Sequence, residues 1–290
     1  MLTVRAPAKL NLTLEVLRKR PDGYHEVRSV LQAISLCDLL HFEESDGIRI
    51  TSDLKGWSAG ESLVSRAVAL LREATGCSQG AAVKIEKRVP LLSGLGGDSS
   101  DAAAALRGLN RLWKLNLTGE RLHGLAARLG SDVAFFLHGG TALSEGRGEI
   151  VTPLPPLPES WVVLVLPDVP REPGKTAAMY RRLKPSHYTD GKITEKLVRA
   201  LREGRRISPS RLFNTFENVA FAPRAKPRVY AEHLVKLGAP RVHLAGSGPA
   251  LFTLLNDKKR AEDLHARCRD QGMETYLVRT LTDGESQDLR

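Results

Sequence analysis

The sequence predicts an α+β protein of two domains, and three features of the chain indicate this. Residues 2–17 and 24–42 alternate as long strands do, whereas residues 61–74 and 100–129 have the periodicity of helices. Residues 152–158 contain four prolines, which suits a semi-rigid connector between domains. Beyond it, the predicted order of strand, helices, two strands, helix and strand matches a ferredoxin-like split βαβ unit. We therefore expect domains at 1–155 and 156–290.

The elements of the first domain follow from turn and helix-stop signals. Lys19-Arg20-Pro21-Asp22-Gly23 is a strong turn signal between the two long strands. Gly76 and Gly130 are expected helix stops, and Gly139-Gly140 should end a buried run. After the two long strands, the expected elements are a strand at 48–50, a helix at 61–74, a strand at 81–89, helices at 100–114 and 119–129, and a buried segment at 133–137.

The second domain is expected to hold most of the remaining helices. Its glycine-rich turn, Gly246-Ser247-Gly248-Pro249, should join a pair of strands within 241–255. The tail from Leu281 is mostly polar, so we expect it to be frayed. The other expected elements are strands at 161–166 and 273–280 and helices at 175–184, 192–203, 209–221, 227–238 and 258–271.

Bulk composition is that of an ordinary globular protein. Hydrophobic residues make up 42% and charged residues 26% of the 290 residues. No apolar run approaches the roughly 20 residues of a membrane span, and the first residues contain no apolar signal core. Cys37, Cys77 and Cys268 are widely spaced and odd in number, which fits reduced structural thiols. We expect a cytoplasmic protein with no membrane partner.

The net charge of +10 leaves two interpretations open. An RNA-binding protein would carry basic clusters, and the chain has short ones such as Arg18-Lys19-Arg20 and Lys258-Lys259-Arg260. These clusters are scattered and have few aromatic residues between them. A solvated surface that attracts phosphorylated small molecules explains the same charge. We favour this interpretation and expect that the protein has no nucleic-acid partner.

The most informative stretch is Pro90 to Asp101, which places three glycines immediately before a helix. Gly94, Gly96 and Gly97 lack side chains, so the backbone can approach a ligand closely. The helix that follows begins with free N–H groups and the positive end of its dipole. Together these features predict an anion site, most simply for phosphate.

Two common phosphate loops are excluded at this stretch. A Walker loop needs Lys after its last glycine, where Asp98 stands, and a dinucleotide fingerprint needs glycine where Ser99 stands. The plainer alternative is a glycine-rich turn before a helix that Ser99 or Ser100 caps.

The wider pattern is more specific than the glycines alone. Lys87-x-x-Pro90, followed by Gly94-Leu95-Gly96-Gly97 and Ser99-Ser100-Asp101, resembles the nucleotide loop of the GHMP kinases. This family phosphorylates small alcohols such as galactose, homoserine and mevalonate. The resemblance implies ATP with Mg²⁺, a ribosomal-protein-S5-domain-2-like first domain and a ferredoxin-like second domain. The ATP-binding residues it implies are Lys87, Pro90, Leu91, Leu92, Ser93, Gly94, Leu95, Gly96, Gly97, Asp98, Ser99 and Ser100, with Ser100 also a candidate metal ligand.

Further motifs resemble one branch of the family, whose substrate carries a cytidine diphosphate group. They are Pro-Ala-Lys-Leu-Asn-Leu from Pro7, Asp-Gly-Tyr-His-Glu from Asp22, Leu-Gly-Ser-Asp-Val from Leu129 and Ala-Gly-Ser-Gly-Pro from Ala245. Alone, Lys9 could be a solvated edge-strand residue and Asp132 a turn residue. The resemblance covers about residues 4–255 and implies that Asp132 is the catalytic base, with Lys9 beside it. Expected substrate-binding residues are Asn11, Tyr24, His25, Thr176, Tyr180, Gly246 and Ser247.

The chain departs from the branch pattern at two positions. Asp98 replaces a glycine of the loop, so its carboxylate must point away from phosphate or meet a metal. Ser62 stands where the branch usually has Asn near the adenine pocket. A GHMP kinase with another acceptor is the main alternative, although the Asp-Gly-Tyr-His-Glu segment speaks against it. We expect a monomer or weak homodimer.

Overall fold

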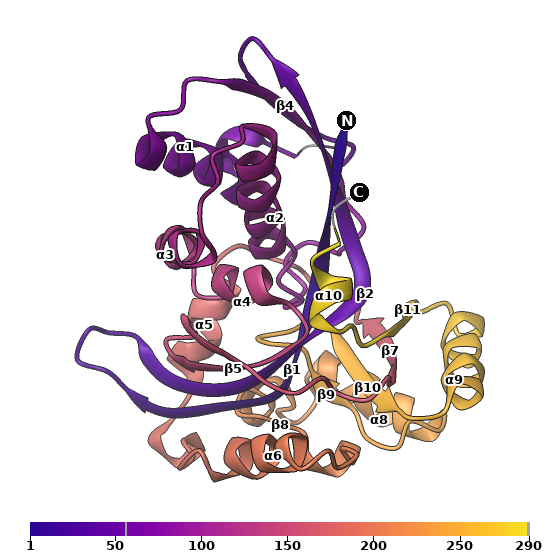
Figure 1. Ribbon diagram of the computed structural model, residues 1–290. Helices are drawn as coiled ribbons and strands as arrows, with labels where there is room; N and C mark the ends of the chain where they lie inside the picture. The colour runs from indigo at the N-terminus through magenta and orange to yellow at the C-terminus, as the bar shows by residue number, and fades with distance from the viewer. Residues whose placement is uncertain (56, 289–290) are drawn as a thin grey trace.

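The computed structural model describes residues 1–55 and 57–288 and has two sheets with helices packed on them (Figure 1). The first sheet has the strand order β3-β4-β2-β1-β8, and β5 pairs with both β2 and β6. Its strands are β1 (Leu2–Lys19), β2 (His25–Ser45), β3 (Ile48–Ser52), β4 (Gly80–Glu86), β5 (Thr141–Gly146), β6 (Ile150–Pro153) and β8 (Phe213–Asn214).

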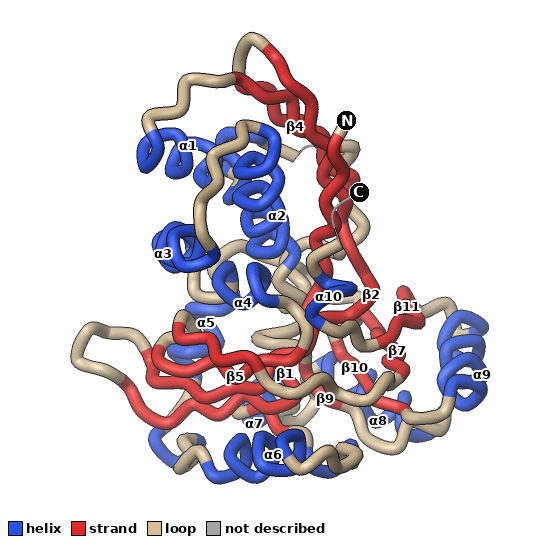
Figure 2. Tube along the Cα trace, in the orientation of Figure 1, coloured by secondary structure: helices blue, strands red, loops and turns tan. Residues whose placement is uncertain are grey.

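The hairpin of β1 and β2 runs through the whole first sheet (Figure 2). The two strands pair from Leu2↔Phe42 to Lys19↔His25, with three register shifts. One end of β2 pairs with β4 and the other with β5. β1 therefore lies between partners on both sides where it also pairs with β8.

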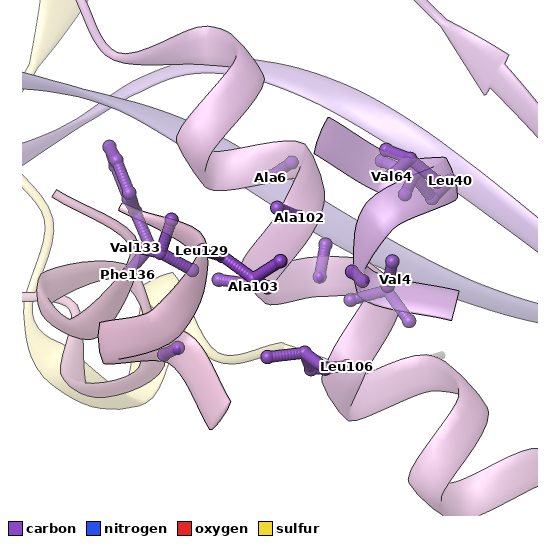
Figure 3. Packing of buried hydrophobic residues seen from close by; sticks show 14 of the residues in the cluster. Val4, Ala6, Leu40, Val64, Ala102, Ala103, Leu106, Leu129, Val133 and Phe136 are labelled. Carbon is purple, nitrogen blue, oxygen red and sulfur yellow. The ribbon is translucent and has the colours of Figure 1, made fainter. Parts of the chain in front are cut away.

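Four helices pack together on the first half of this sheet: α1 (Leu63–Thr75), α2 (Gly97–Leu112), α3 (Gly119–Leu129) and α4 (Val133–His138). The alanines 102–105 of α2 are fully buried. Their small side chains allow α2 to lie close to Val4 and Ala6 of β1, and Val133 and Phe136 of α4 complete this core (Figure 3). The alanine run thus holds the start of α2 firmly against the sheet.

The second sheet confirms the predicted ferredoxin-like unit. Its strands are β7 (Trp161–Leu166), β9 (His243–Leu244), β10 (Leu251–Leu255) and β11 (Glu274–Arg279), in the antiparallel order β11-β7-β10-β9. The accompanying helices are α5 (Lys175–Arg182), α6 (Lys192–Arg202), α7 (Glu217–Ala220), α8 (Lys226–Lys236) and α9 (Lys258–Asp270), and short 3₁₀ turns are η1 (Ala59–Glu61), η2 (Pro185–His187) and η3 (Pro209–Arg211). The division of the chain at residue 155 stays a prediction.

Two expectations about the second half were wrong. Residues 209–221 do not form one helix, because η3 leads into β8, which pairs in parallel with Thr13 and Leu14 of β1 before α7 begins. The tail is not frayed at 281–287, since Leu281 is buried and α10 (Asp283–Ser286) has a capping box formed by Thr282 and Glu285. In the first case pairing with β1 overrides the local helix signal, and in the second capping orders a segment that is polar.

Among the described residues, no helix combines the length and apolar character needed to cross a membrane.

Candidate active site

The glycine loop surrounds a cavity of about 230 Å³ at the start of α2. Gly94 and Gly96 have φ of +89° and +77°, the left-handed region that favours glycine. Gly96 is the N-cap of α2, so the cap that the plainer alternative placed at Ser99 or Ser100 was wrong. The helix dipole and the unbonded N–H groups of the first turn favour an anion in this cavity. Its lining residues are Leu63, Val89, Pro90, Leu91, Leu92, Ser93, Gly94, Gly96, Gly97, Asp98 and Ser99.

A second cavity of about 220 Å³ holds most of the remaining predicted site residues. β1 supplies Lys9 and Asn11 from the middle of the sheet, where both side chains are buried. Asp132 precedes α4, and its side chain is 39% exposed, which leaves it open to a ligand. The lining residues named by sequence reasoning are Lys9, Asn11, Gly94, Gly96, Asp132, Thr176, Tyr180, Gly246 and Ser247.

The polar groups of the second cavity form a chain of contacts that starts at Lys9. The Lys9 ammonium donates to Asn11 Oδ1 at 2.8 Å, and its Nζ lies 3.4 Å from Asp132 Oδ2. Asn11 Nδ2 donates to Ser29 Oγ at 2.8 Å. This network fixes the orientation of the lysine and places a positive charge beside a partly exposed carboxylate.

The two cavities share Gly94 and Gly96, so the glycine loop is the wall between them. The Lys9 backbone N–H donates to Leu95 O at 2.9 Å, which ties the loop to β1. The second glycine loop is tied to it through Ala250 N–H, which donates to Ser93 O at 3.1 Å. A group bound in one cavity therefore lies next to a group bound in the other.

The approach of the two glycine loops leaves no room for a side chain. A Cβ at Gly94 would lie 2.1 Å from Ala245 O, and one at Gly246 would lie 2.8 Å from Gly94 O and 3.3 Å from Lys9 Nζ. Thr176 and Ser247 join α5 to the second loop through a hydroxyl contact of 2.8 Å.

An aromatic cluster lies beside the second cavity. His25 stacks on Tyr180, with ring centroids 4.7 Å apart, and meets Tyr188 edge-on at 6.0 Å. Burial, and then the charge of Lys19, lowers the pKa of His25, so its imidazole is neutral at neutral pH. Burial, and then the charge of Asp132, raises the pKa of Tyr180, which keeps its phenol protonated. Tyr24 instead lies exposed beside Arg147, whose guanidinium carbon is 4.8 Å from the ring centroid.

Lys87 lies outside both cavity linings, in a buried ionic cluster. Its Nζ is 2.6 Å from Asp38 Oδ2, 2.7 Å from Asp101 Oδ2 and 3.7 Å from Asp98 Oδ1. Burial alone would lower the pKa of Lys87, but Asp101 and Asp38 outweigh it and raise the pKa. The lysine thus holds the start of α2 to β2, and Asp98 turns toward it with a half-exposed side chain. Direct contact between Lys87 and ATP stays a prediction.

Two other predicted loop residues also lie outside the cavity linings. Leu95 is fully buried in a hydrophobic core to which strands of both sheets contribute. Ser100 is 1% exposed, and its Oγ has no hydrogen-bond partner among the described residues. A buried hydroxyl without a partner at a helix start is the kind of atom that a bound metal or phosphate would satisfy.

Sequence reasoning missed several residues of the site. Ser29 and Arg147 line the second cavity. Asn214 donates to Leu244 O at 2.9 Å and to Gly246 O at 2.8 Å, and so positions the second glycine loop. The signal for Asn214 was a polar residue between Phe213 and Phe216, but it lay in the segment expected to be a helix.

Comparison with known proteins supports the arrangement. Residues 62–140 match the family model for the N-terminal domain of GHMP kinases. The chain is 50% identical to 4-diphosphocytidyl-2-C-methyl-D-erythritol kinase of Dehalococcoides mccartyi, over 97% of this chain and 99% of that one.

Solved structures agree with the sequence match. A crystal structure of 4-(cytidine 5'-diphospho)-2C-methyl-D-erythritol kinase matches with a TM-score of 0.82 at 33% identity, over 97% of this chain and 99% of that one. Homoserine kinase of Cytophaga hutchinsonii shares the fold with a TM-score of 0.70 at 18% identity, over 100% of this chain and 97% of that one.

Proposed function

The chain belongs to the 4-diphosphocytidyl-2-C-methyl-D-erythritol kinases, a branch of the GHMP kinases. We therefore propose that it transfers a phosphoryl group from ATP to the 2-hydroxyl of 4-diphosphocytidyl-2-C-methyl-D-erythritol. The reaction belongs to non-mevalonate synthesis of isoprenoid precursors. The observation that carries the proposal is the placement of Lys9 and Asp132 in a cavity that shares its glycine wall with the anion site.

The donor is ATP, with its phosphates against the glycine loop. The start of α2 neutralises part of their charge, because its dipole and free N–H groups point at the loop. Rigid packing of the alanines 102–105 holds these donors in place, so little reorganisation is needed on binding. The γ-phosphate would reach the wall formed by Gly94 and Gly96.

Magnesium fits the donor set through the unpartnered hydroxyl of Ser100 and, nearby, the half-exposed carboxylate of Asp98. Among the residues that the structure describes, no three His, Cys, Asp or Glu side chains form a metal cluster, so ATP oxygens would supply most of the ligands. When bound beside Ser100 and Asp98, the ion would offset the negative charge of the phosphates.

The acceptor hydroxyl would lie between Asp132 and the glycine wall. Its oxygen attacks the γ-phosphorus, the bond to the β–γ bridging oxygen breaks, and the hydroxyl proton passes to Asp132. Transfer of this kind depends mainly on positioning and charge neutralisation. Lys9, whose Nζ is 3.4 Å from Asp132, offsets the negative charge that develops.

The cytidine end of the substrate would bind at the aromatic cluster. His25 is a neutral, stacked imidazole and can exchange hydrogen bonds with the polar edge of cytosine. Tyr24 offers an exposed ring for stacking. Arg147 lines the same cavity and offers a cation to the diphosphate.

Release of ADP tests the proposal. The enzyme should release ADP with 4-diphosphocytidyl-2-C-methyl-D-erythritol and not with mevalonate or homoserine, all at equal concentration. Equal or faster turnover of mevalonate or homoserine would reassign the acceptor. Salt-sensitive RNA affinity without turnover would favour the RNA-binding alternative.

We also propose that the enzyme is cytoplasmic and acts as a monomer or weak homodimer. Light scattering across a concentration series would test the second statement, and a stable assembly at low concentration would contradict it.

A further inference from the structure

A third cavity, which we call the α6 pocket, lies away from both cavities of the active site. It has a volume of about 500 Å³ and is formed by α6, the segment from Arg205 through η3 to Phe213, and Arg241. Figure 1 shows α6 along the base of the molecule, below β8. The size is within the range of small-molecule sites.

The α6 pocket is apolar at its floor and basic at its rim. Leu197, Ala200 and Leu212 are buried, and Ile193 and Phe213 are half-buried. Among the described residues that line the pocket, none is acidic. Five exposed cations surround the floor, namely Lys196, Arg199, Arg205, Arg211 and Arg241.

Most of these cations have no partner among the residues that the structure describes. Arg205 contacts Glu203. Across residues 1–55 and 57–288, Lys196, Arg199, Arg211 and Arg241 form no side-chain ion pair or hydrogen bond that could neutralise them. Four unpaired cations around one concave surface repel one another, and a bound anion would relieve this repulsion.

The walls of the α6 pocket are joined to the catalytic region. Asn214, which follows Phe213, donates to Gly246 O of the second glycine loop at 2.8 Å. Thr194 of α6 donates its backbone N–H to Glu15 Oε2 of β1 at 2.7 Å. His243 Nε2 contacts Pro209 O at 3.2 Å, which joins η3 to β9. These contacts connect the walls of the α6 pocket to the segments that hold the second glycine loop.

We propose that the α6 pocket is a second ligand site, for a small amphiphilic anion that carries a phosphate or diphosphate on a short hydrocarbon chain. The phosphate binds the arginines of the rim, whose planar guanidinium groups match phosphate oxygens. The hydrocarbon covers Ile193, Leu197 and Phe213. An acidic nucleic acid is a poorer fit, because an apolar concavity of this size offers one half-buried ring and no row of stacking platforms.

Titration calorimetry with n-hexyl phosphate tests the proposal, on the full chain saturated with a non-hydrolysable ATP analogue so that the glycine loop is occupied. The wild type should bind one molecule of n-hexyl phosphate at least about tenfold more tightly than inorganic phosphate. The double variant Arg199→Glu/Arg211→Glu should lose at least about tenfold in affinity for n-hexyl phosphate. Arg202→Glu, an exposed arginine of the same helix outside the pocket lining, is the matched control and should bind as the wild type does.

A second variant separates the two halves of the recognition. Ile193→Ser should lower the affinity for n-hexyl phosphate and leave the affinity for inorganic phosphate unchanged, because the substitution removes apolar surface only. All these variants should keep kinase turnover without n-hexyl phosphate, since none of the residues lies in the active site. Equal affinity of wild type and double variant, equal affinity for the two phosphates, absence of binding, or tighter binding of a uridine 20-mer RNA at this pocket would each overturn the proposal.

Discussion

At the scale of single residues, the proposed chemistry depends on the pairing of Lys9 with Asp132. Asp132 is a carboxylate that both faces the acceptor cavity and lies within 3.4 Å of a buried ammonium group. Its backbone is placed by the start of α4, whose core residues Val133 and Phe136 are fully or almost fully buried. The position of the Asp132 main chain is therefore set by packing.

Replacement of Asp132 by Ala should abolish turnover while ATP binding is retained. Loss of the proton acceptor should lower kcat by about two to four powers of ten. Stopped assays of ADP release give kcat, and calorimetry with a non-hydrolysable ATP analogue gives the affinity. Glu262→Ala, which removes an exposed carboxylate of α9, is the control and should leave both unchanged. Turnover near that of the wild type in folded Asp132→Ala protein would remove Asp132 from the mechanism.

Replacement of Tyr24 by Ala should weaken substrate binding and leave the stability of the fold nearly unchanged. The ring is 56% exposed, so its loss should change the melting temperature little. Stacking of a base on an aromatic ring contributes roughly 1–3 kcal/mol, so substrate affinity should fall by about one to two powers of ten.

Substrate calorimetry and a thermal melt on one Tyr24→Ala preparation check both parts. A lower melting temperature with unchanged substrate affinity would show that the ring only packs against the sheet. ATP affinity serves as the internal control and should not move.

At the scale of elements, the glycine loop and α2 act as one unit. α2 is held by its alanines against the sheet and by the Lys87 cluster to β2, so the loop before it has defined ends. Lys87 pairs with Asp38 of β2 and Asp101 of α2, and its contact with ATP stays a prediction. Its side chain is 3% exposed and bonded to two carboxylates, which makes it a fastening of the loop in this structure.

Replacement of Gly96 by Val should weaken the binding of ATP. Gly96 has a φ of +77°, and a Cβ there would lie 2.9 Å from the Phe136 ring and 3.2 Å from Lys9 Cε. The loop must shift, so its N–H groups move away from the phosphates. Calorimetry with a non-hydrolysable ATP analogue should show lower affinity. Gly119→Val, where nothing lies within 4 Å of the new Cβ, is the control. Unchanged affinity in folded Gly96→Val protein would place the phosphates elsewhere.

How much of these elements was predictable depended on whether their signals were local. The hairpin, the alanine helix and the ferredoxin-like order have local signals of alternation, helix propensity and strand order, and all were predicted. β8 has only two residues and exists because β1 offers a parallel edge at Thr13 and Leu14. Asn214 could not be assigned to the second glycine loop without that pairing. The α6 pocket likewise joins Arg199 with Arg241, which no spacing in the sequence indicates.

At the scale of the whole molecule, β2 and the end of the chain join the two sheets. Leu281 N–H donates to Ala33 O at 2.9 Å, and Arg279 N–H donates to Ser35 Oγ at 3.0 Å. Gln32, which is fully buried, donates to both Ala33 O and Leu281 O at 2.8 Å and accepts from Thr141 Oγ1 at 2.6 Å. The returning chain thus fixes the relative position of the sheets, and with it the distance between the two glycine loops.

Replacement of Gln32 by Met should destabilise the whole protein. The change keeps the shape of the side chain but leaves Leu281 O without its donor and the Thr141 hydroxyl without its acceptor, which costs about 1–3 kcal/mol in the free energy of unfolding. Urea denaturation measures this loss. Gln271→Met, on the exposed end of α9, should leave the free energy of unfolding unchanged. Equal stability of the two variants would show that the contact between the sheets does not depend on Gln32.

The wall that Gly94 and Gly96 form between the two cavities tolerates no side chain, unlike the lining of the acceptor cavity. It consists of main chain alone, and any side chain added to it would collide with Ala245 O or Phe136. The acceptor side is instead lined mainly by side chains, from β1, α5 and the β5–β6 turn. A lineage could therefore exchange one alcohol for another while it inherits the nucleotide half intact, and the partition itself would be the last part to change.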